Sequence, residues 1–416
     1  MEIKLMATSR LVNEDIDERI PYNSKTAFDE EYNTYMAGLM GGTCYMKESF
    51  ESLLSQDKDK HIGRGNLVAS SGHHSCFGHS HISLEITGVP KIFAMIINNE
   101  KEYYTSEKSG RYTILKDPND SENLYDKWLE IFIEKIKEAY PNESYMSDMR
   151  IKKLAQENAR CLNSIFLPAT NMIYTTSYRQ LNYLCHWFEA EIDKPTNYIY
   201  ERLKPYFEDF VKFVKEVNLY KDSVSNDNKG RKLSLIRNGF DKSLYDYTYQ
   251  ATYKCSIPAL ADLQRHRSLD YFIDNKSVTD FITGKTRNYF IPEIIKDDQK
   301  LVDLWLLDLA KKSVDDIPQG ALIKVCESGT IDSFIMRAQE RLCTCAQRDV
   351  MCIVKDRTVE YYSSLKESAK ESCDSGYYEE LSERLKPYTL GARCLAGYKC
   401  STPCGFKDGI NCTRKI

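Results

Sequence analysis

Residues 72–89 read Gly-His-His-Ser-Cys-Phe-Gly-His-Ser-His-Ile-Ser-Leu-Glu-Ile-Thr-Gly-Val, and this stretch decides how the rest of the chain is interpreted. It contains four of the chain's seven histidines, followed at once by the alternating apolar residues Ile82, Leu84 and Ile86. Alternation with a period of two predicts a β-strand with one buried face. Further on, Ser109-Gly110-Arg111 combines a hydroxyl, backbone amides freed by glycine and a guanidinium. These are the groups that a phosphate site uses.

The order of these parts resembles the flavin-dependent thymidylate synthases, whose pattern runs H-x-S-x-F-E-H, a strand, R-H-R-x-x-S and E-x-S-G-R-Y. The positions in register with that pattern are His73, Ser75, Phe77, His79, Glu107, Ser109, Gly110, Arg111 and Tyr112. Where the family has R-H-R, this chain reads Asn99-Glu100-Lys101, and Arg265-His266-Arg267 occurs only later. An interpretation of the sequence has to explain this displacement.

The composition is that of a globular protein large enough for two domains. The chain has 416 residues, 42% of them hydrophobic and 28% charged, with a formal net charge of −4. It has no basic excess that would favour duplex nucleic acid as a partner. No apolar run approaches the roughly 20 residues of a membrane helix, and the N-terminus lacks the apolar core of a secretory signal. We therefore expect a cytoplasmic protein whose fourteen cysteines are mostly reduced thiols.

Apolar periodicity predicts the main strands and helices. The expected strands are residues 3–7 and 245–253, and the expected helices are 124–136, about 148–163 and 301–309. The polar, glycine-containing stretch 222–232 has no periodicity and is the best candidate for a linker.

The part after this linker resembles a shorter version of the part before it. Leu167-Pro168 and Ile317-Pro318 are corresponding landmarks, and counting on from each proline matches Glu191 with Arg341. Arg341 and the following Ala346-Gln347 resemble the family's L-R-x-D-x-x-A-Q. We expect an α/β (α+β) fold of two tandem copies, each a mostly antiparallel sheet with long helices. The boundaries are residues 1–221 for the first copy, 222–232 for the linker, 233–372 for the second copy and 373–416 for a cysteine-rich tail.

The resemblance implies roles for particular residues. Arg265, His266 and Arg267 hold flavin and reach toward a pyrimidine nucleotide, with Gln264 beside them. Arg341 polarises the pyrimidine ring, so Arg341, Arg265 and His266 are the expected catalytic residues. His73, Ser75 and His79 lie near the flavin or folate ring. The nucleotide and its phosphate are held by Glu107, Lys108, Ser109, Gly110 and Arg111.

The two copies have lost complementary parts of this set. The first copy keeps the S-G-R-Y element and lacks R-H-R and the ring arginine, whereas the second keeps Arg265–Arg267 and Arg341. Because the family builds its active sites between the subunits of a tetramer, we expect a composite site joining the two copies. A homodimer of this chain would then replace the tetramer.

The expected activity is C5 methylation of a uracil nucleotide, dUMP to dTMP, using FAD, NADPH and methylenetetrahydrofolate. Arg341 would stabilise negative charge on the ring without a protein nucleophile. The flavin-holding Asn and Arg of the family are replaced by Gln180 and Asn182 in the first copy and by Thr330 and Asp332 in the second. The alternatives are therefore hydroxymethylation or another C5 modification of a different pyrimidine nucleotide, or a non-catalytic descendant that binds nucleotide or flavin.

The tail carries four cysteines on a glycine-rich stretch, Cys394, Cys400, Cys404 and Cys412. Four thiolates suit tetrahedral zinc, whose binding would organise a segment too short for its own core. An iron–sulfur cluster uses the same number of ligands, and disulfides or unmodified thiols are further alternatives.

Overall fold

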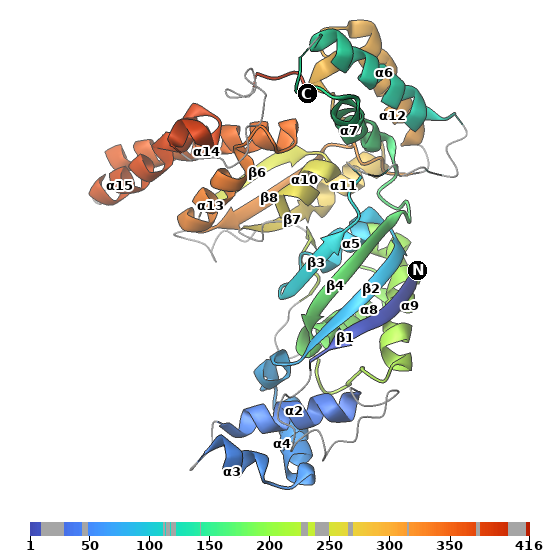
Figure 1. The fold of residues 1–416 in the computed structure, drawn as a ribbon, viewed down its shortest axis with the longest axis vertical. Helices are drawn as coiled ribbons and strands as arrows, with labels where there is room; N and C mark the ends of the chain where they lie inside the picture. The colour runs from blue at the N-terminus through green and yellow to red at the C-terminus, as the bar shows by residue number, and fades with distance from the viewer. Residues whose placement is uncertain are drawn as a thin grey trace. The chain divides into compact units, whose positions relative to one another are not determined.

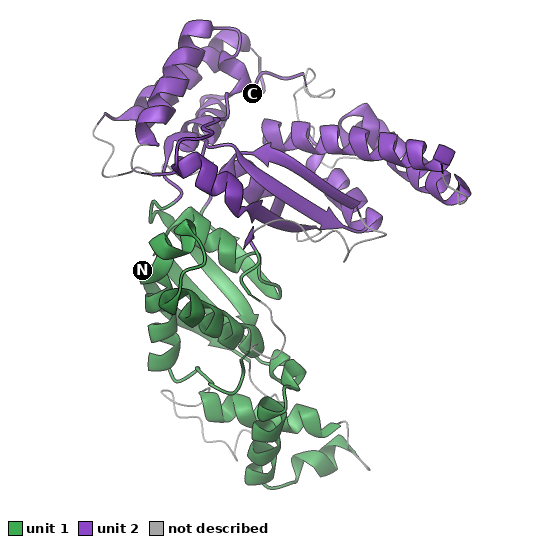
Figure 2. Cartoon of the chain, turned by 180° about the vertical axis from the view of Figure 1, so that it is seen from behind, with its two compact units in different colours: residues 1–108, 166–234 green, residues 109–165, 235–416 purple. Residues whose placement is uncertain are grey.

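The computed structural model describes residues 1–9, 29–43, 49–110, 113, 117, 122–141, 143–225, 232–237, 249–264, 269–313, 316–371, 375–397 and 413–416. Several site candidates lie outside these residues: Arg111, Arg265, His266, Arg267, Cys400, Cys404 and Cys412. The chain forms two compact units, unit 1 from residues 1–108 and 166–234 and unit 2 from residues 109–165 and 235–416 (Figure 2). Each unit has a four-stranded sheet in its described part. The expected mixed α/β fold with mostly antiparallel sheets is confirmed.

The sheet of unit 1 has the strand order β1-β2-β4-β3. Its strands are β1 (Glu2–Thr8), β2 (His81–Val89), β3 (Tyr103–Glu107) and β4 (Thr170–Ser177). All neighbouring pairs are antiparallel. Ile82, Leu84 and Ile86 are fully buried, as their alternation predicted. In the middle of the sheet, Tyr174 of β4 pairs with Leu84 on one side and with Thr105 on the other.

Helices α5 (Lys91–Ile97), α8 (Tyr178–Asp193) and α9 (Tyr198–Glu216) pack on one face of this sheet (Figure 1). Aromatic rings fill the space between these helices, and the Phe188 and Phe207 rings stack with centroids 4.4 Å apart. Ser177, the last residue of β4, accepts a hydrogen bond from the Gln180 N–H and caps α8. This cap explains why the strand passes directly into a helix.

A helical pair precedes the histidine-rich stretch. Helices α2 (Glu30–Gly42) and α4 (Lys58–Ser70) approach so closely that a Cβ added at Gly38 would lie 1.8 Å from the His61 backbone oxygen. The short helix α3 (Phe50–Leu54) lies between them in sequence. A 3-10 turn, η2 (His74–Gly78), then leads into β2.

The sheet of unit 2 has the strand order β5-β7-β8-β6. Its strands are β5 (Ile236–Arg237), β6 (Tyr249–Cys255), β7 (Asp270–Asp274) and β8 (Ile323–Gly329). β8 is antiparallel to both of its neighbours, whereas β5 is parallel to β7. The part of the expected strand before Tyr249 lies outside the described residues.

The helices of unit 2 follow its strands in turn. They are α10 (Ile257–Gln264) after β6, α11 (Asn275–Ile282) after β7, and α13 (Ile331–Arg341), α14 (Arg348–Glu371) and α15 (Ser375–Leu385) after β8. In Figure 1, α14 and α15 run side by side at one end of the unit.

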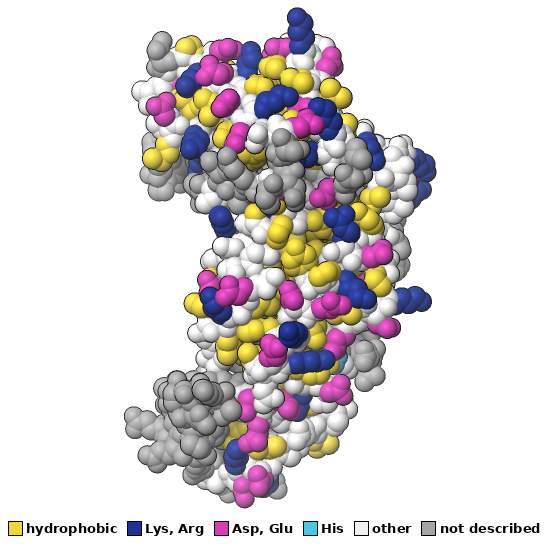
Figure 3. Space-filling view, turned by 90° about the vertical axis from the view of Figure 1, so that its right-hand side faces the viewer, with side chains coloured by type: hydrophobic (Ala, Val, Ile, Leu, Met, Phe, Trp, Pro, Cys, Tyr) yellow, Lys and Arg dark blue, Asp and Glu magenta, His cyan; other side chains and the backbone are white. Residues whose placement is uncertain are grey.

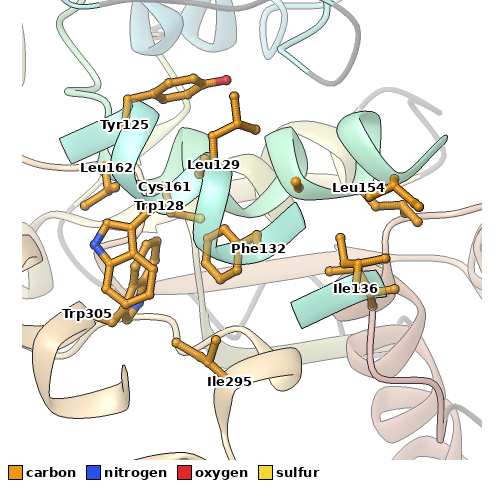
Figure 4. Close-up of a cluster of buried hydrophobic side chains, with 14 of the residues drawn as sticks. Tyr125, Trp128, Leu129, Phe132, Ile136, Leu154, Cys161, Leu162, Ile295 and Trp305 are labelled. Carbon is orange, nitrogen blue, oxygen red and sulfur yellow. The ribbon is translucent and has the colours of Figure 1, made fainter. Parts of the chain in front are cut away.

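A second core of unit 2 is helical and is formed by α6 (Leu124–Ala139), α7 (Asp148–Ala159) and α12 (Gln299–Lys312) (Figure 4). Trp128 and Trp305 meet edge to face, with ring centroids 4.7 Å apart. The fully buried Asp308 accepts hydrogen bonds from Trp128 Nε1 at 3.0 Å and Lys127 Nζ at 2.5 Å. Both α6 and α7 thus pack within unit 2, although the sequence division assigns residues 109–165 to the first copy.

Charged side chains of both signs are interspersed over the described residues drawn on the face in Figure 3. None of the helices in the described part of the chain is long and apolar enough to cross a membrane.

Candidate functional site

In the histidine-rich stretch, one histidine is buried and the other three are exposed. His74 is buried, with Nδ1 2.9 Å from the Tyr183 hydroxyl and Nε2 2.8 Å from the Ala69 carbonyl oxygen. Both ring nitrogens are therefore occupied in holding η2 against α4 and α8. His73, Ser75 and His79, the residues that the family pattern selects, have exposed side chains. Their positions leave them accessible to a ligand of unit 1.

Glu107, the glutamate of the E-x-S-G-R-Y element, forms an ion pair within unit 1. Its Oε1 lies 2.5 Å from Nζ of Lys91 in the first turn of α5, and its side chain is 5% exposed. The neighbouring Lys108 donates its backbone N–H to the Asn171 carbonyl at 2.8 Å and exposes its side chain. The strand end is thus fixed by Lys91 and Asn171.

Ser109 and Gly110 begin the part of the chain that packs in unit 2. The Ser109 carbonyl accepts hydrogen bonds from the Thr113 backbone N–H at 3.2 Å and the Thr113 hydroxyl at 2.9 Å. These bonds close a turn around Gly110, which is buried. Arg111, which follows Gly110 in the sequence, lies outside the described residues.

Arg341, the expected ring arginine, is the last residue of α13. Its Nη2 donates a hydrogen bond to the backbone carbonyl of Asp262 in α10. Gln264, the last residue of α10, is buried and is followed directly by residues 265–267. Arg341 and the helix that leads into Arg265-His266-Arg267 therefore meet in unit 2.

Next to Arg341 lies a buried polar cluster that sequence reasoning missed. Arg160, which follows α7, donates a hydrogen bond from Nη2 to the Gln347 side-chain oxygen. Burial raises the pKa of Asp349 to about 6. The positive charge of Arg160 opposes this increase, and the negative charges of Asp262 and Glu157 add to it. No sequence signal could have linked Arg160 to Gln347, because the two residues belong to segments far apart in the chain.

Two acceptor atoms in this region have no hydrogen-bond partner among the described residues. They are Oδ2 of Asp262 and Oγ1 of Thr344, and both are buried. Asp262 also accepts a hydrogen bond from Arg341 through its backbone carbonyl. Carboxylate and hydroxyl oxygens can accept hydrogen bonds from ring N–H or hydroxyl donors, which nucleotides and flavins have.

Glu191 of unit 1 is the residue that the expected alignment of the two copies matches with Arg341. Glu191 is buried and accepts hydrogen bonds from the Thr196 backbone N–H at 2.7 Å and the Thr196 hydroxyl at 2.9 Å. Burial raises the pKa of this carboxyl, and the Thr196 hydrogen bonds oppose the shift. Asn182 is likewise engaged internally, since its side chain bonds the Tyr178, Leu219 and Lys221 backbones. These internal hydrogen bonds stabilise unit 1.

The last part of the chain is anchored to the segment between α13 and α14. The Arg393 backbone N–H donates to the Leu342 carbonyl at 2.6 Å, and Arg414 Nη1 donates to the Thr344 carbonyl at 2.6 Å. Cys394 lies next to Arg393 in the 3-10 turn η8 (Arg393–Ala396) and is exposed. Within the described ranges, no group of three or more His, Cys, Asp or Glu side chains is arranged to hold a metal ion.

Comparisons with known proteins follow this geometry. No curated protein matches the chain. A crystal structure of flavin-dependent thymidylate synthase ThyX from Helicobacter pylori, complexed with FAD and dUMP, is similar to the chain at 17% sequence identity. The similarity covers 54% of this chain and 99% of that chain, with a TM-score of 0.29. A family model, Thy1, described as thymidylate synthase complementing protein, matches residues 31–196, so that this part of the chain is similar to the Thy1 family.

Proposed function

We propose that the chain is a flavin-dependent thymidylate synthase-like enzyme that methylates C5 of dUMP, with methylenetetrahydrofolate as carbon donor and NADPH as reductant. The match of residues 31–196 to the Thy1 family supports the reaction class. The observation that carries the proposal is that expected site residues from distant parts of the sequence belong to unit 2. Ser109 and Gly110, from the first third of the sequence, occur in the same compact unit as Gln264 and Arg341.

The topology of the two sheets supports an origin by tandem duplication. In the chain order of both sheets, a strand, a helix and a second strand are followed by further helices and then by a strand that inserts between the first two. For the first sheet, the further helices α6 and α7 pack in unit 2. Thus β4 lies between β2 and β3, as β8 lies between β6 and β7. Helices α9 and α14 also begin equally far after Pro168 and Pro318.

The packing of residues 109–165 in unit 2 supports a composite site. If each copy supplies only part of one composite site, the motifs that this site does not use can change in sequence without affecting it. Glu191 fits this idea, because a buried carboxylate at the position matching Arg341 would repel an anionic ligand.

Each residue of the proposed site has a chemical role. Ser109, Gly110 and Arg111 bind the nucleotide phosphate through a hydroxyl, backbone amides and a guanidinium. Arg341 stabilises negative charge on the uracil ring while C5 becomes nucleophilic. Bound FAD supplies the redox chemistry, and Arg265 and Arg267 offset its negative charge. Gln264 orients the nucleotide at the end of α10.

The deciding experiment combines cofactor analysis with a matched pair of variants. The visible spectrum of the purified protein measures flavin per chain, and tritium release from 5-tritiated dUMP measures activity with NADPH and methylenetetrahydrofolate. Arg341→Met is expected to abolish tritium release, whereas Glu191→Gln, at the matching position of the other copy, is expected to retain it. Loss of Arg111 or Arg265 without loss of dUMP or flavin binding would contradict the composite site.

A non-catalytic descendant is the second candidate, and two contacts favour it. In copy two, Thr330 accepts from the Ser333 N–H and caps α13, and Asp332 pairs with Arg384 of α15. These are the positions at which the family holds flavin. Protein that binds no flavin, even with added FAD and dUMP, would select this candidate. A product heavier than dTMP by one oxygen would instead select hydroxymethylation.

We also propose a homodimer and a structural zinc site at Cys394, Cys400, Cys404 and Cys412. Because Arg393 and Arg414 anchor both ends of this segment in unit 2, metal binding would stabilise a short closed loop.

A further inference from the structure

The layer between the sheet of unit 2 and α13 contains a buried ion pair. Glu327 of β8 and Arg337 of α13 are both 0% exposed, and Arg337 Nη1 donates a hydrogen bond to Glu327 Oε2. The same carboxylate accepts from two hydroxyls of β6, from Tyr249 to Oε1 at 2.5 Å and from Tyr253 to Oε2 at 2.7 Å. Three directional bonds thus connect β8, β6 and α13.

Aromatic rings surround the guanidinium. The Arg337 Cζ atom lies 4.5 Å from the Phe334 ring centroid. The centroid of the Tyr249 ring lies 4.4 Å from that of Phe334 and 4.7 Å from that of Tyr361 of α14. Burial alone lowers the pKa of Arg337, but the attraction of Glu327 raises it well above its usual value. The guanidinium of Arg337 therefore keeps its positive charge although it is fully buried.

The sheet of unit 1 has an uncharged residue in the middle of its inner strand β4. Tyr174 pairs with both neighbouring strands in the middle of its sheet, as Glu327 does with Ala251 and Tyr271 in unit 2. Tyr174 is fully buried. Because apolar side chains of similar volume can replace a buried ion pair without loss of stability, folding alone does not require charge at this place.

What distinguishes α13 is the residue one turn after Arg337. Arg341 is four residues further on, so both arginines lie on the same helix face. Apolar contacts resist separation of a helix from a sheet but are non-directional, whereas hydrogen bonds to a fixed carboxylate define the rotation and axial position of the helix. A change in the rotation or axial position of α13 would move the Arg341 guanidinium away from the α10 carbonyl that it contacts.

We propose that Glu327 and Arg337 are a positioning pair that fixes α13 on the sheet, so that Arg341 is held at the end of α10 in the proposed nucleotide site. This role rests on the proposed function, because it acts through Arg341. Neither member of the pair contacts the nucleotide.

The test uses the double variant Glu327→Met/Arg337→Met in the full-length protein. Methionine approximates both side chains in length, so we expect a normal circular dichroism spectrum and a melting temperature equal to or above that of the wild type. The dUMP dissociation constant is expected to rise ~10- to 100-fold, with a fall in kcat, because a displacement of about 1 Å at a reacting centre can have effects of this size. KM for NADPH should stay unchanged. The control is Lys324→Met. Lys324 lies on the same strand as Glu327, its side chain is exposed, and the substitution removes its ion pair with Asp274 of β7.

Hydrogen exchange separates failure of this inference from failure of the proposed function. The α13 amides should exchange faster in the double variant than in the wild type at equal global stability, whatever the ligand. Unchanged exchange, or wild-type dUMP affinity and kcat in the folded double variant, would overturn the positioning role. Wild-type protein without dUMP binding would overturn the proposed function, and the exchange experiment would still decide whether the pair fixes α13.

Discussion

Arg160 and Gln347 are hydrogen-bonded to each other through their side chains, although 187 positions separate them. Both are buried, at 8% and 5% exposure. The contact ties the segment that precedes β4 to the turn that precedes α14. It therefore joins residues 109–165 to the segment that contains Ala346 and Gln347 within unit 2.

Replacing Arg160 with methionine should destabilise unit 2. The substitution leaves Gln347 without this donor and removes the positive charge that favours the ionised form of the buried Asp349. A loss on the order of 2–4 kcal/mol is expected in urea unfolding. Lys152→Met, on the exposed side of α7, should change the unfolding free energy by less than about 0.5 kcal/mol. Equal effects of the two substitutions would refute the role assigned to Arg160.

Asp349→Asn should make unfolding less dependent on pH. The pKa of Asp349 is about 6 in the folded protein and 3.8 ordinarily, so the folded state holds the proton more tightly. Wild-type stability therefore falls as pH rises from about 4 to 6, by on the order of 2–3 kcal/mol. The Asn variant should match the wild type near pH 4 and exceed it at pH 8 in urea titrations. Asp356→Asn, exposed on the same helix, is the control, and a pH-independent difference for Asp349→Asn would contradict the prediction.

Gly38→Ala should loosen the α2–α4 pair. Its new Cβ would meet the His61 carbonyl oxygen at 1.8 Å, which forces the helices apart and costs roughly 1–3 kcal/mol or more. Gly63→Ala is a matched control, because nothing lies within 4 Å of a Cβ there. That substitution should stabilise α4 by about 0.5–1 kcal/mol through helix propensity. Thermal melting measures both, and a neutral Gly38→Ala would disprove the close approach.

The cysteine tail should bind about one metal ion per chain. Elemental analysis would distinguish zinc from iron, and a chelator should lower the melting temperature, because metal binding is coupled to folding of the tail. Cys404→Ser should reduce the metal content, whereas Cys76→Ser, in η2 of unit 1, should not. Metal-free wild-type protein purified without chelators would end the metal hypothesis.

Local features of the structure could be predicted from the sequence because they depend on short-range periodicity. The alternation at Ile82, Leu84 and Ile86 correctly indicated a half-buried strand, and the helical spacing around Trp128 and Trp305 correctly indicated α6 and α12.

Long-range packing could not be predicted in the same way. The assignment of residues 109–165 to unit 2 depends on the fit of α6 and α7 against α12, which leaves no periodic signal. Glu327 and Arg337 have the spacing of ordinary strand and helix residues, and only the fold reveals that both charges are buried. The Lys91–Glu107 pair was missed because its two members lie on different elements.

The edge-to-face contact between Trp128 and Trp305 also gives the molecule an optical label. The chain has three tryptophans, and this contact places two of them in the helical core of unit 2, whereas Trp187 lies in unit 1 beside Tyr183. Excitonic coupling between the two packed indoles should give a near-ultraviolet dichroic band that vanishes when α6 separates from α12. Because Trp187 takes no part in that coupling, the loss of the band reports on the melting of the helical core of unit 2 alone.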